Sequence, residues 1–428
     1  MPQPVIIPRS DHPISRQHID ADALKVLYRL QQFDHIAYLV GGSVRDLLLG
    51  RTPKDFDIGT SAHPYQVKRL FRNCWIIGRR FRLAHVKFGL KVIEVATFRR
   101  QVPAGTEEEP MPAPPVPTPP SAAVDDPDLL VHHDNTFGTP EEDAFRRDFT
   151  LNALFYDIET RSIIDYVGGL DDIRAGLIRC IGVPEERFQE DPVRMLRAVA
   201  LAARLDFRID EPILEAIGRY HGELARSAPA RLMEEIYKVM RAGAAEKTFR
   251  MLVETGLLAA LAPEVPGRIT NTFWQSLTAI DSYRRAFKRN PESLGNAILL
   301  GSLLIPLGLL DQHHGRTKEL GARFGILPLA RRDVEFLRQI LMLQRHLRDP
   351  NASQRHKRGV MHRSAFPAAL MWLELHGNTP ALVESWRALH AEASTHPPDA
   401  DDLLPASDAP PRRRRRRRRR RRFPTAGV

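Results

Sequence analysis

The sequence has few cysteines: only Cys74 and Cys180 occur among 428 residues. This scarcity excludes a Cys-rich zinc module and a disulfide-stapled fold, and it fits a reducing compartment. The first ten residues hold three prolines and no long apolar run, so we expect no secretory signal and a cytoplasmic location.

Long hydrophobic runs are also missing. The longest uncharged stretch covers residues 293–310, and its apolar part begins only at Ala297 and contains Pro306. A run this short predicts a buried helix that is interrupted near the proline, and we expect no integral membrane segment.

Several catalytic signatures do not occur. They are G-x-x-x-x-G-K-[ST], G-x-G-x-x-G, G-x-S-x-G, H-E-x-x-H and C-x-x-C, so the commonest nucleotide, hydrolase and zinc motifs are excluded. His313 and His314 show no metal-ligand spacing. The tryptophans are expected to pack in the core or between helices rather than to serve as stacking platforms: Trp75, Trp274, Trp372 and Trp386.

Excess charge of one sign is confined to a single segment. The net charge is +11, but Arg412–Arg422 is an unbroken arginine run. The rest of the chain holds equal numbers of basic and acidic residues. Adjacent guanidiniums seek counter-charge, so the run is expected to bind nucleic-acid phosphates, with a solvated tail as the alternative. Its candidate RNA-binding residues include Arg412, Arg415, Arg418 and Arg422.

The pattern along the chain predicts an α+β N-terminal domain, with a small mixed sheet and helices, followed by an all-α C-terminal region and a disordered basic tail. Strands are expected at 37–40, 56–58, 84–88, 91–98, 151–156 and 163–167. The predicted segments are a flexible lead-in (1–20), a catalytic domain (21–170) with a Pro-rich insertion (101–130), a helical neck (171–245), a helical body (246–395) and the disordered tail (396–428).

The first motif is Leu39-Val-Gly-Gly-Ser-Val-Arg-Asp46. Two glycines between a strand and a helix let backbone N–H groups converge on an anion. Ser43 offers one more donor and Arg45 adds positive charge. An ordinary strand–turn–helix connection is the alternative.

The second motif is Lys54-Asp-Phe-Asp57. On a strand, Asp55 and Asp57 point to the same face and Phe56 points into the core. Two adjacent carboxylates repel each other unless a cation such as a divalent metal lies between them. Glu94, on a later strand, is a candidate third carboxylate. The alternatives are a polar turn and, for Glu94, a surface residue.

The third motif is Phe145-Arg-Arg-Asp-Phe-Thr-Leu-Asn152. Its arginines, Arg146 and Arg147, suit phosphates and carboxylates. Asp148 and Asn152 can hydrogen-bond a ribose or support a metal site. A structural arginine–aspartate network is the alternative.

The fourth motif is Glu190-Asp-Pro-Val-Arg-Met-Leu-Arg197. Asp191 followed by proline predicts a helix start. Arg194 and Arg197 then lie on one side of that helix, where Glu190 and Asp191 can hold Arg194 rigid against a base edge. A surface ion-pair network is the alternative.

In this order and at these distances, the four motifs resemble those of the class II nucleotidyltransferases, which comprise the CCA-adding enzymes and the bacterial poly(A) polymerases. The resemblance covers about residues 21–245 apart from the Pro-rich insertion, and the C-terminal third matches loosely. One departure is Ser43, where relatives often carry a third glycine. Four features resemble the poly(A) polymerase subgroup in addition to the basic tail: the segments 5–9, 14–16, 76–86 and 134–138.

The resemblance implies a template-independent polynucleotide adenylyltransferase that adds AMP from ATP to RNA 3′ ends in mRNA processing and decay. It implies two Mg²⁺ ions on Asp55 and Asp57, with Glu94 as further support, and Asp148 as a third catalytic-site residue. The implied nucleotide-binding residues are Gly41, Gly42, Ser43, Arg45, Arg147, Asn152, Glu190, Asp191, Arg194 and Arg197, with Arg231, Glu234 and Lys238 as braces.

The implied partners are RNA 3′ ends of mRNA, and also of tRNA and small RNAs, together with RNA-degradation or RNA-chaperone proteins. The neck and the body are expected to bind RNA, and the protein is expected to be a monomer. The nearest alternative is a tRNA CCA-adding enzyme. Two others belong to different classes: a non-catalytic RNA-binding adaptor and a D-x-D glycosyltransferase, which the other three motifs disfavour.

Overall fold

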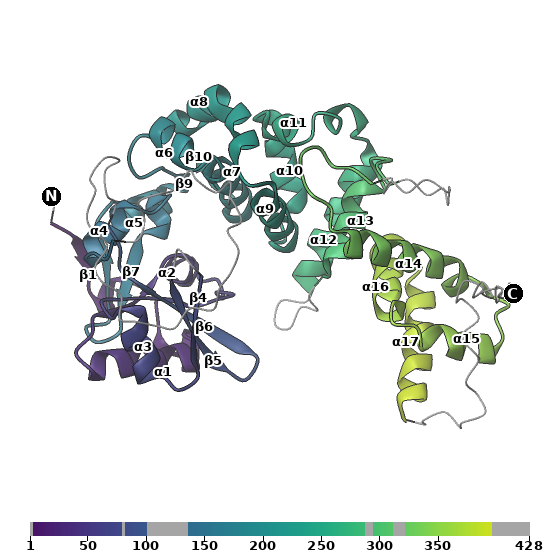
Figure 1. Cartoon of the computed structure of the whole chain (residues 1–428), viewed down its shortest axis with the longest axis horizontal. Helices are drawn as coiled ribbons and strands as arrows, with labels where there is room; N and C mark the ends of the chain where they lie inside the picture. The colour runs from purple at the N-terminus through teal and green to yellow at the C-terminus, as the bar shows by residue number, and fades with distance from the viewer. Residues whose placement is uncertain (1–2, 79–81, 101–135, 287–293, 311–321, 396–428) are drawn as a thin grey trace, which may run out of the picture. The chain divides into compact units, whose positions relative to one another are not determined.

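The computed structural model describes residues 3–78, 82–100, 136–286, 294–310 and 322–395 (Figure 1). The chain divides into two compact units, Met1–Val334 and Glu335–Val428. The Pro-rich segment 101–130, the tail 396–428 with its arginine run, and the pair His313 and His314 lie outside the described residues.

A mixed eight-stranded sheet organises the N-terminal part of the first unit. Its strand order is β1-β8-β7-β2-β3-β6-β5-β4, and its neighbours are antiparallel except for the parallel pair β3 and β6. The predicted mixed sheet is confirmed. The strands are β1 (Val5–Ile7), β2 (Ala37–Val40), β3 (Asp57–Thr60), β4 (Cys74–Ile77), β5 (Leu83–Phe88), β6 (Lys91–Thr97), β7 (Leu154–Asp157) and β8 (Ser162–Asp165).

The expectation of a loose lead-in over residues 1–20 is wrong for the described part of that segment. The apolar run Val5–Ile7 forms edge strand β1 and pairs with β8, with Val5 opposite Asp165. Behind it, Ile14 is fully buried and the His12 Nε2 atom lies 2.9 Å from the carbonyl oxygen of Arg161. The short apolar run was visible in the sequence, but its partner strand is more than 150 residues away, which local patterns do not reveal.

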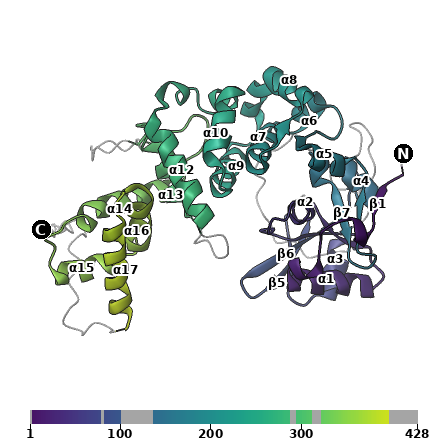
Figure 2. The same cartoon turned by 180° about the vertical axis from the view of Figure 1, so that it is seen from behind.

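Helices α1 (Ala21–Gln32) and α3 (Pro64–Leu70) lie against the same side of the sheet in both views (Figure 1, Figure 2). The predicted N-cap of α1 is confirmed, because the Asp20 carboxylate accepts the backbone N–H of Asp22 at 2.9 Å. Val26 and Leu27 of α1 pack with Ile58 and Val95 of the sheet in one apolar core. On the opposite face, a second cluster joins β2 and β7 to α4 (Pro140–Phe145).

The rest of the first unit is helical, apart from the short parallel pair β9 (Leu177–Ile178) and β10 (Arg208–Ile209). Its helices are α2 (Gly42–Leu48), α5 (Gly169–Ala175), α6 (Pro184–Glu190), α7 (Val193–Leu205), α8 (Glu211–Tyr220), α9 (Pro229–Arg241), α10 (Ala245–Glu254), α11 (Leu257–Leu261), α12 (Asn271–Ala286) and α13 (Asn296–Leu304). Helix α13 is buried and ends before Pro306, as predicted. Among the described residues, no helix is long and apolar enough to cross a membrane.

The second unit contains α15 (Gln354–Met361), α16 (Phe366–His376) and α17 (Pro380–Thr395), and it receives most of α14 (Arg331–Leu347). Trp386 is buried against Phe366, and its indole N–H donates to the carbonyl oxygen of Leu347 at 3.0 Å. Trp372 is buried as well, which fits the predicted packing role. Trp75 does not fit that role, because it is 53% exposed on β4.

Candidate active site

The Gly41–Gly42 turn joins β2 directly to α2. Gly41 has a φ of +69°, and a Cβ there would approach the Arg147 Nη1 atom to 3.1 Å, so the position requires glycine. Ser43 was expected to offer a hydrogen-bond donor on the open side of the turn, but it does not point there. Its hydroxyl is buried and donates to the carbonyl oxygen of Val40 at 2.9 Å, so it stabilises the turn.

Two carboxylates of the second motif lie at the start of β3. Asp57 is the first residue of the strand, whereas Asp55 precedes it and is 71% exposed beside Lys54. Asp57 keeps an exposed side chain, but the protein atoms around the cleft bury part of its carboxylate. This burial, followed by repulsion from Glu94 and Asp55, raises the pKa of Asp57 to about 6.

Uncompensated negative charge and an all-oxygen donor set suit a hard divalent cation. In the parts of the chain that the structure describes, no group of three or more His, Cys, Asp or Glu side chains is arranged to hold a metal alone. Mg²⁺ commonly takes one or two carboxylates and completes its shell with water and substrate phosphates. Asp55 and Asp57 fit that donor set, with Glu94 as the neighbouring negative charge.

Asp143 clamps both arginines of the third motif. Its Oδ1 atom accepts Arg146 Nη2 at 2.7 Å and its Oδ2 atom accepts Arg147 Nη2 at 2.8 Å. Burial acts to raise the pKa of Asp143, but Arg147 and Arg146 outweigh it and hold the pKa below its usual range. The Arg147 guanidinium also lies over the ring of Phe155, so this side chain is fixed on two sides.

Asp148 is buried and bonded to its own neighbourhood. Its Oδ1 atom accepts the N–H of Phe149 at 2.9 Å and the Asn152 amide at 3.2 Å. Its Oδ2 atom lies 2.7 Å from Arg197 Nη2, an ion pair whose geometry is not that of a hydrogen bond. Burial favours the neutral acid, but Arg197 and Asn152 prevail and lower the pKa of Asp148. Asn152 in turn accepts a hydrogen bond from Arg45.

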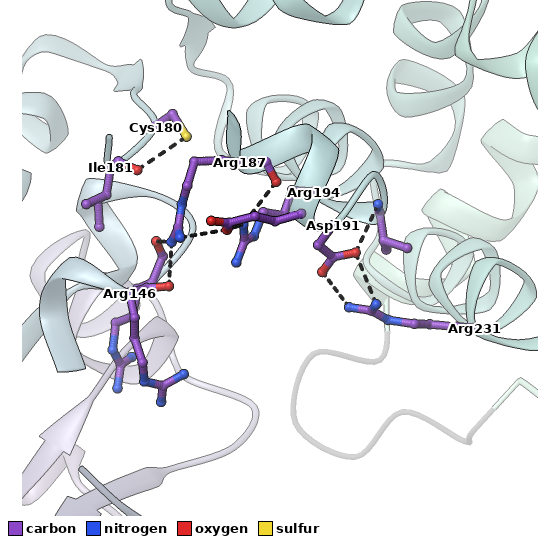
Figure 3. Close-up of polar contacts among 10 residues, drawn as sticks. Arg146, Cys180, Ile181, Arg187, Asp191, Arg194 and Arg231 are labelled. Carbon is purple, nitrogen blue, oxygen red and sulfur yellow. Dashed lines mark hydrogen bonds and ion pairs between the residues drawn. The ribbon is translucent and has the colours of Figure 1, made fainter. Parts of the chain in front are cut away.

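A second network connects the third motif to the fourth (Figure 3). The buried Arg187 donates to the backbone carbonyl oxygens of Arg146 and Arg147. It also donates to the Glu190 carboxylate at 2.9 Å, and Arg194 Nη1 shares that same oxygen at 2.8 Å. The expected restraint of Arg194 by Glu190 is therefore present.

Asp191 does not hold Arg194, in contrast to the expectation. Its two oxygens accept both terminal nitrogens of Arg231 from α9, at 3.0 and 2.6 Å (Figure 3). The predicted helix start is also displaced slightly. Pro192 occupies the cap position, and the Asp191 carboxylate accepts the N–H of Val193 at 3.2 Å.

The motifs converge on one cleft of about 590 Å³. Eight basic and four acidic side chains line it, so the cleft favours an anion. Asp55, Ser43, Glu190, Glu94 and Glu234 lie outside this lining. The predicted residues within it are Gly41, Gly42, Arg45, Asp57, Arg146, Arg147, Asp148, Asn152, Asp191, Arg194, Arg197, Arg231 and Lys238.

Sequence reasoning missed three residues of this network. Asp143 stands three and four positions before its arginine partners, a spacing that the sequence displays. Arg187 precedes Glu190 by three residues, so the sequence displays the same helical spacing for this pair. Arg204 lines the cleft and pairs with Asp46 at 3.1 Å, and no local pattern connects residues so far apart.

Three family models match the chain. They are described as the poly A polymerase head domain (residues 37–179), the probable RNA and SrmB-binding site of polymerase A (206–267) and the polymerase A arginine-rich C-terminus (318–422). Together they cover well over half of the sequence.

The curated relatives include poly(A) polymerases and CCA-adding enzymes. Poly(A) polymerase I of Escherichia coli O157:H7 is 48% identical over 264 residues, which are 62% of this chain and 54% of that protein. Poly(A) polymerase I of Haemophilus influenzae is 41% identical, over 62% of this chain and 56% of that protein. The CCA-adding enzyme of Lactobacillus johnsonii is 35% identical, over 57% and 55%. The chain thus spans about half the length of the curated relatives it matches.

Solved structures share the fold. A Bacillus stearothermophilus CCA-adding enzyme in complex with CTP matches with a TM-score of 0.60 and 26% identity, covering 87% of this chain and 83% of that one. A Thermotoga maritima CCA-adding enzyme complexed with tRNA matches with a TM-score of 0.51 and 21% identity, covering 90% and 86%. The three family models, the poly(A) polymerase relatives and the four motifs in one cleft place the chain in the class II nucleotidyltransferase family, in its poly(A) polymerase subgroup.

Proposed function

We propose that the chain is a template-independent poly(A) polymerase that transfers AMP from ATP to RNA 3′ ends. The observation that carries the proposal is a strongly basic cleft that holds a glycine turn and the raised-pKa carboxylate Asp57. Its reaction needs positioning and charge neutralisation, because the phosphoryl group passes between two oxygens in line.

Each set of residues has a separate task in this proposal. The Gly41–Gly42 turn admits the triphosphate close to the backbone, and Arg147 supplies a fixed positive charge beside it. Asp55 and Asp57 would hold Mg²⁺, which would supply Lewis acidity toward the 3′-hydroxyl and positive charge for the leaving pyrophosphate. Asp148 is a positioning residue, because its oxygens fix Asn152 and Arg197.

The base is read by the fourth motif. Arg194 is held by Glu190 and by the carbonyl oxygen of Arg187, so its guanidinium keeps one orientation towards the cleft. Arg231 holds Asp191 from the next helix. A rigid donor and acceptor set of this kind discriminates bases at the cost of little ordering entropy.

The substrates and surroundings follow from the same proposal. RNA 3′ ends of mRNA, tRNA and small RNAs are the acceptors, and the arginine run adds a salt-sensitive contact with phosphates. RNA-degradation or RNA-chaperone proteins are the proposed partners of a monomeric enzyme. Cys74 and Cys180 are free and buried, which supports a cytoplasmic location.

The test is extension of a 5′-labelled RNA without tRNA structure, with Mg²⁺ and each nucleoside triphosphate in turn. A long ladder with ATP alone is expected. Asp55→Ala combined with Asp57→Ala should abolish it, whereas Asp171→Ala, which removes an exposed carboxylate elsewhere in the first unit, should retain it.

A CCA-adding enzyme is the second candidate, favoured by the CCA-adding relatives and the shared fold. It would extend only tRNA that ends before CCA and would require CTP before ATP. Failure of the wild-type protein to extend either RNA would support a non-catalytic RNA-binding adaptor and contradict both enzymatic proposals.

A further inference from the structure

Among the described residues, the helices leave one face of strands β4, β5 and β6 open. The core-facing residues of these strands, such as Cys74, Val86 and Ile93, are buried in the main apolar cluster. Side chains alternate along a strand, so their neighbours point the opposite way. This open face comprises Trp75, Ile77, His85, Lys87, Val92 and Glu94, and Trp75, Ile77 and Val92 are 53%, 50% and 41% exposed.

Three side chains of this face, Trp75, His85 and Glu94, form a row across the sheet that continues to Asp57 on β3. Trp75 pairs with His85 and His85 pairs with Glu94 in the strand register. His85 Nε2 lies 3.6 Å from Glu94 Oε1. The parallel pairing of β3 with β6, in which Ile58 lies opposite Val95, places Asp57 beside Glu94. Strands are about 4.8 Å apart, so Trp75 stands about 14 Å from Asp57.

The strand order gives the direction of the row. The Gly41–Gly42 turn follows β2, which is the neighbour of β3 on one side, and β6 is its neighbour on the other. A triphosphate in the turn therefore occupies the β2 side of Asp57. An in-line displacement requires the attacking hydroxyl to approach from the side opposite the leaving pyrophosphate. The open face of β6, β5 and β4 lies on that opposite side of Asp57.

We propose that the RNA strand reaches Asp57 along this open face and that Trp75 stacks on one of its bases a few nucleotides before the 3′ end. The inference rests on the proposed function, because it assigns the path of the acceptor RNA. Trp75 is thus a positioning residue: it contacts the acceptor strand about 14 Å from the reacting atoms, by the same strand spacing.

The side chains of the face suit single-stranded RNA. Single-strand binding sites combine an aromatic surface for the bases with basic groups for the phosphates. Trp75 supplies the aromatic surface, and Lys87 lies two residues beyond His85 on the same face of β5. The row of side chains ends at Asp57, a carboxylate of the candidate active site. This continuity favours RNA as the ligand, because a docking surface for a second protein chain would not need to end at an active-site carboxylate.

The test measures steady-state extension of oligo(A) primers of increasing length by the full-length protein at saturating ATP. Alanine substitution of a stacking aromatic weakens binding by roughly 5- to 150-fold. Trp75→Ala is therefore expected to raise the KM for long primers by that factor and to leave the KM for ATP and kcat near wild type. Trp75→Phe keeps a ring and retains most of the affinity. Phe33→Ala, at a ring of similar exposure (46%) directly after α1, is the matched control.

A second measurement uses primers with one abasic nucleotide at successive positions. In the wild type, an abasic nucleotide at one position a few nucleotides from the 3′ end should raise the KM for the primer. In Trp75→Ala, the same abasic nucleotide should cause no further increase in that KM. Equal KM values for wild type and Trp75→Ala on every primer would overturn the inference while the proposed function stands. A change in oligomeric state with unchanged KM would overturn it in favour of a protein contact. Absence of extension by the wild type would instead refute the proposed function.

Discussion

Arg231 donates both terminal nitrogens to the two carboxylate oxygens of Asp191, which is 40 residues earlier in the chain. The fork joins α9 to the start of α7, and Asp191 is 7% exposed. A bidentate guanidinium fixes the orientation of a carboxylate as well as its charge. The position of the fourth motif relative to the cleft therefore depends on a residue outside that motif.

Loss of this fork should impair base selection. We expect Arg231→Ala to raise the KM for ATP by about tenfold, which corresponds to one charge-assisted hydrogen bond, and to reduce the preference for ATP over CTP. Arg231→Lys should restore little, because an ammonium group cannot bond both oxygens in a fixed plane. Extension kinetics with each nucleotide measure both effects, and an unchanged ATP to CTP ratio would contradict the assigned role.

Gly41 and Gly50 form a matched pair for testing the turn. Both have positive φ, +69° and +65°, but only at Gly41 would a Cβ approach another residue, Arg147. Gly50→Ala should lower the free energy of unfolding by about 1 kcal/mol through backbone strain alone. Gly41→Ala should lower it further and should also raise the KM for ATP. Denaturant unfolding and extension assays separate the two effects, and identical behaviour of both variants would argue against the close approach.

Asp57 should give the reaction an acidic limit. With its pKa raised to about 6, the carboxyl is protonated below that pH and then cannot hold a metal. We expect kcat/KM at limiting Mg²⁺ to fall as pH decreases through about 6. A higher Mg²⁺ concentration should shift this acidic limb of the pH profile to lower pH. A limb that does not move with Mg²⁺ concentration would assign the titration to another group.

The same shift affects the stability of the metal-free protein. The folded state binds the Asp57 proton more tightly than the unfolded chain does, where the pKa is near 3.8. Its stabilising contribution is present at low pH and is lost as pH rises through about 6. Mg²⁺ should therefore raise the Tm at about pH 7.5 more than at about pH 5. Asp57→Asn should raise the metal-free Tm at the higher pH and remove most of the Mg²⁺ effect.

Asp143 should contribute strongly to stability although it lies outside the cleft lining. It is 2% exposed and forms ion pairs with both Arg146 and Arg147. Asp143→Asn removes the negative charge that the two guanidiniums share, so we expect a loss of about 3 kcal/mol in the free energy of unfolding and a higher KM for ATP. Asp171→Asn, whose partner Arg174 is exposed, is the control and should change neither. Equal stabilities of the two variants would contradict the clamp.

Features that depend on local spacing could be predicted from the order of the residues. Asp20 as a cap, the strands around Tyr38 and Val92, and the end of α13 before Pro306 follow from propensities within a few residues. The four motifs also indicated the family, because their residue types and order are specific even without a fold.

Which of these residues contact one another depends on how distant segments pack. Asp191 pairs with Arg231 instead of Arg194, Asp148 pairs with Arg197, and β1 joins β8. The exposure of Trp75 in line with Asp57 likewise depends on a strand order that places β4 at the edge. Helix and strand periodicity fixes the face on which a side chain lies, but contacts between distant segments are set by how the elements pack, and no local pattern encodes that choice.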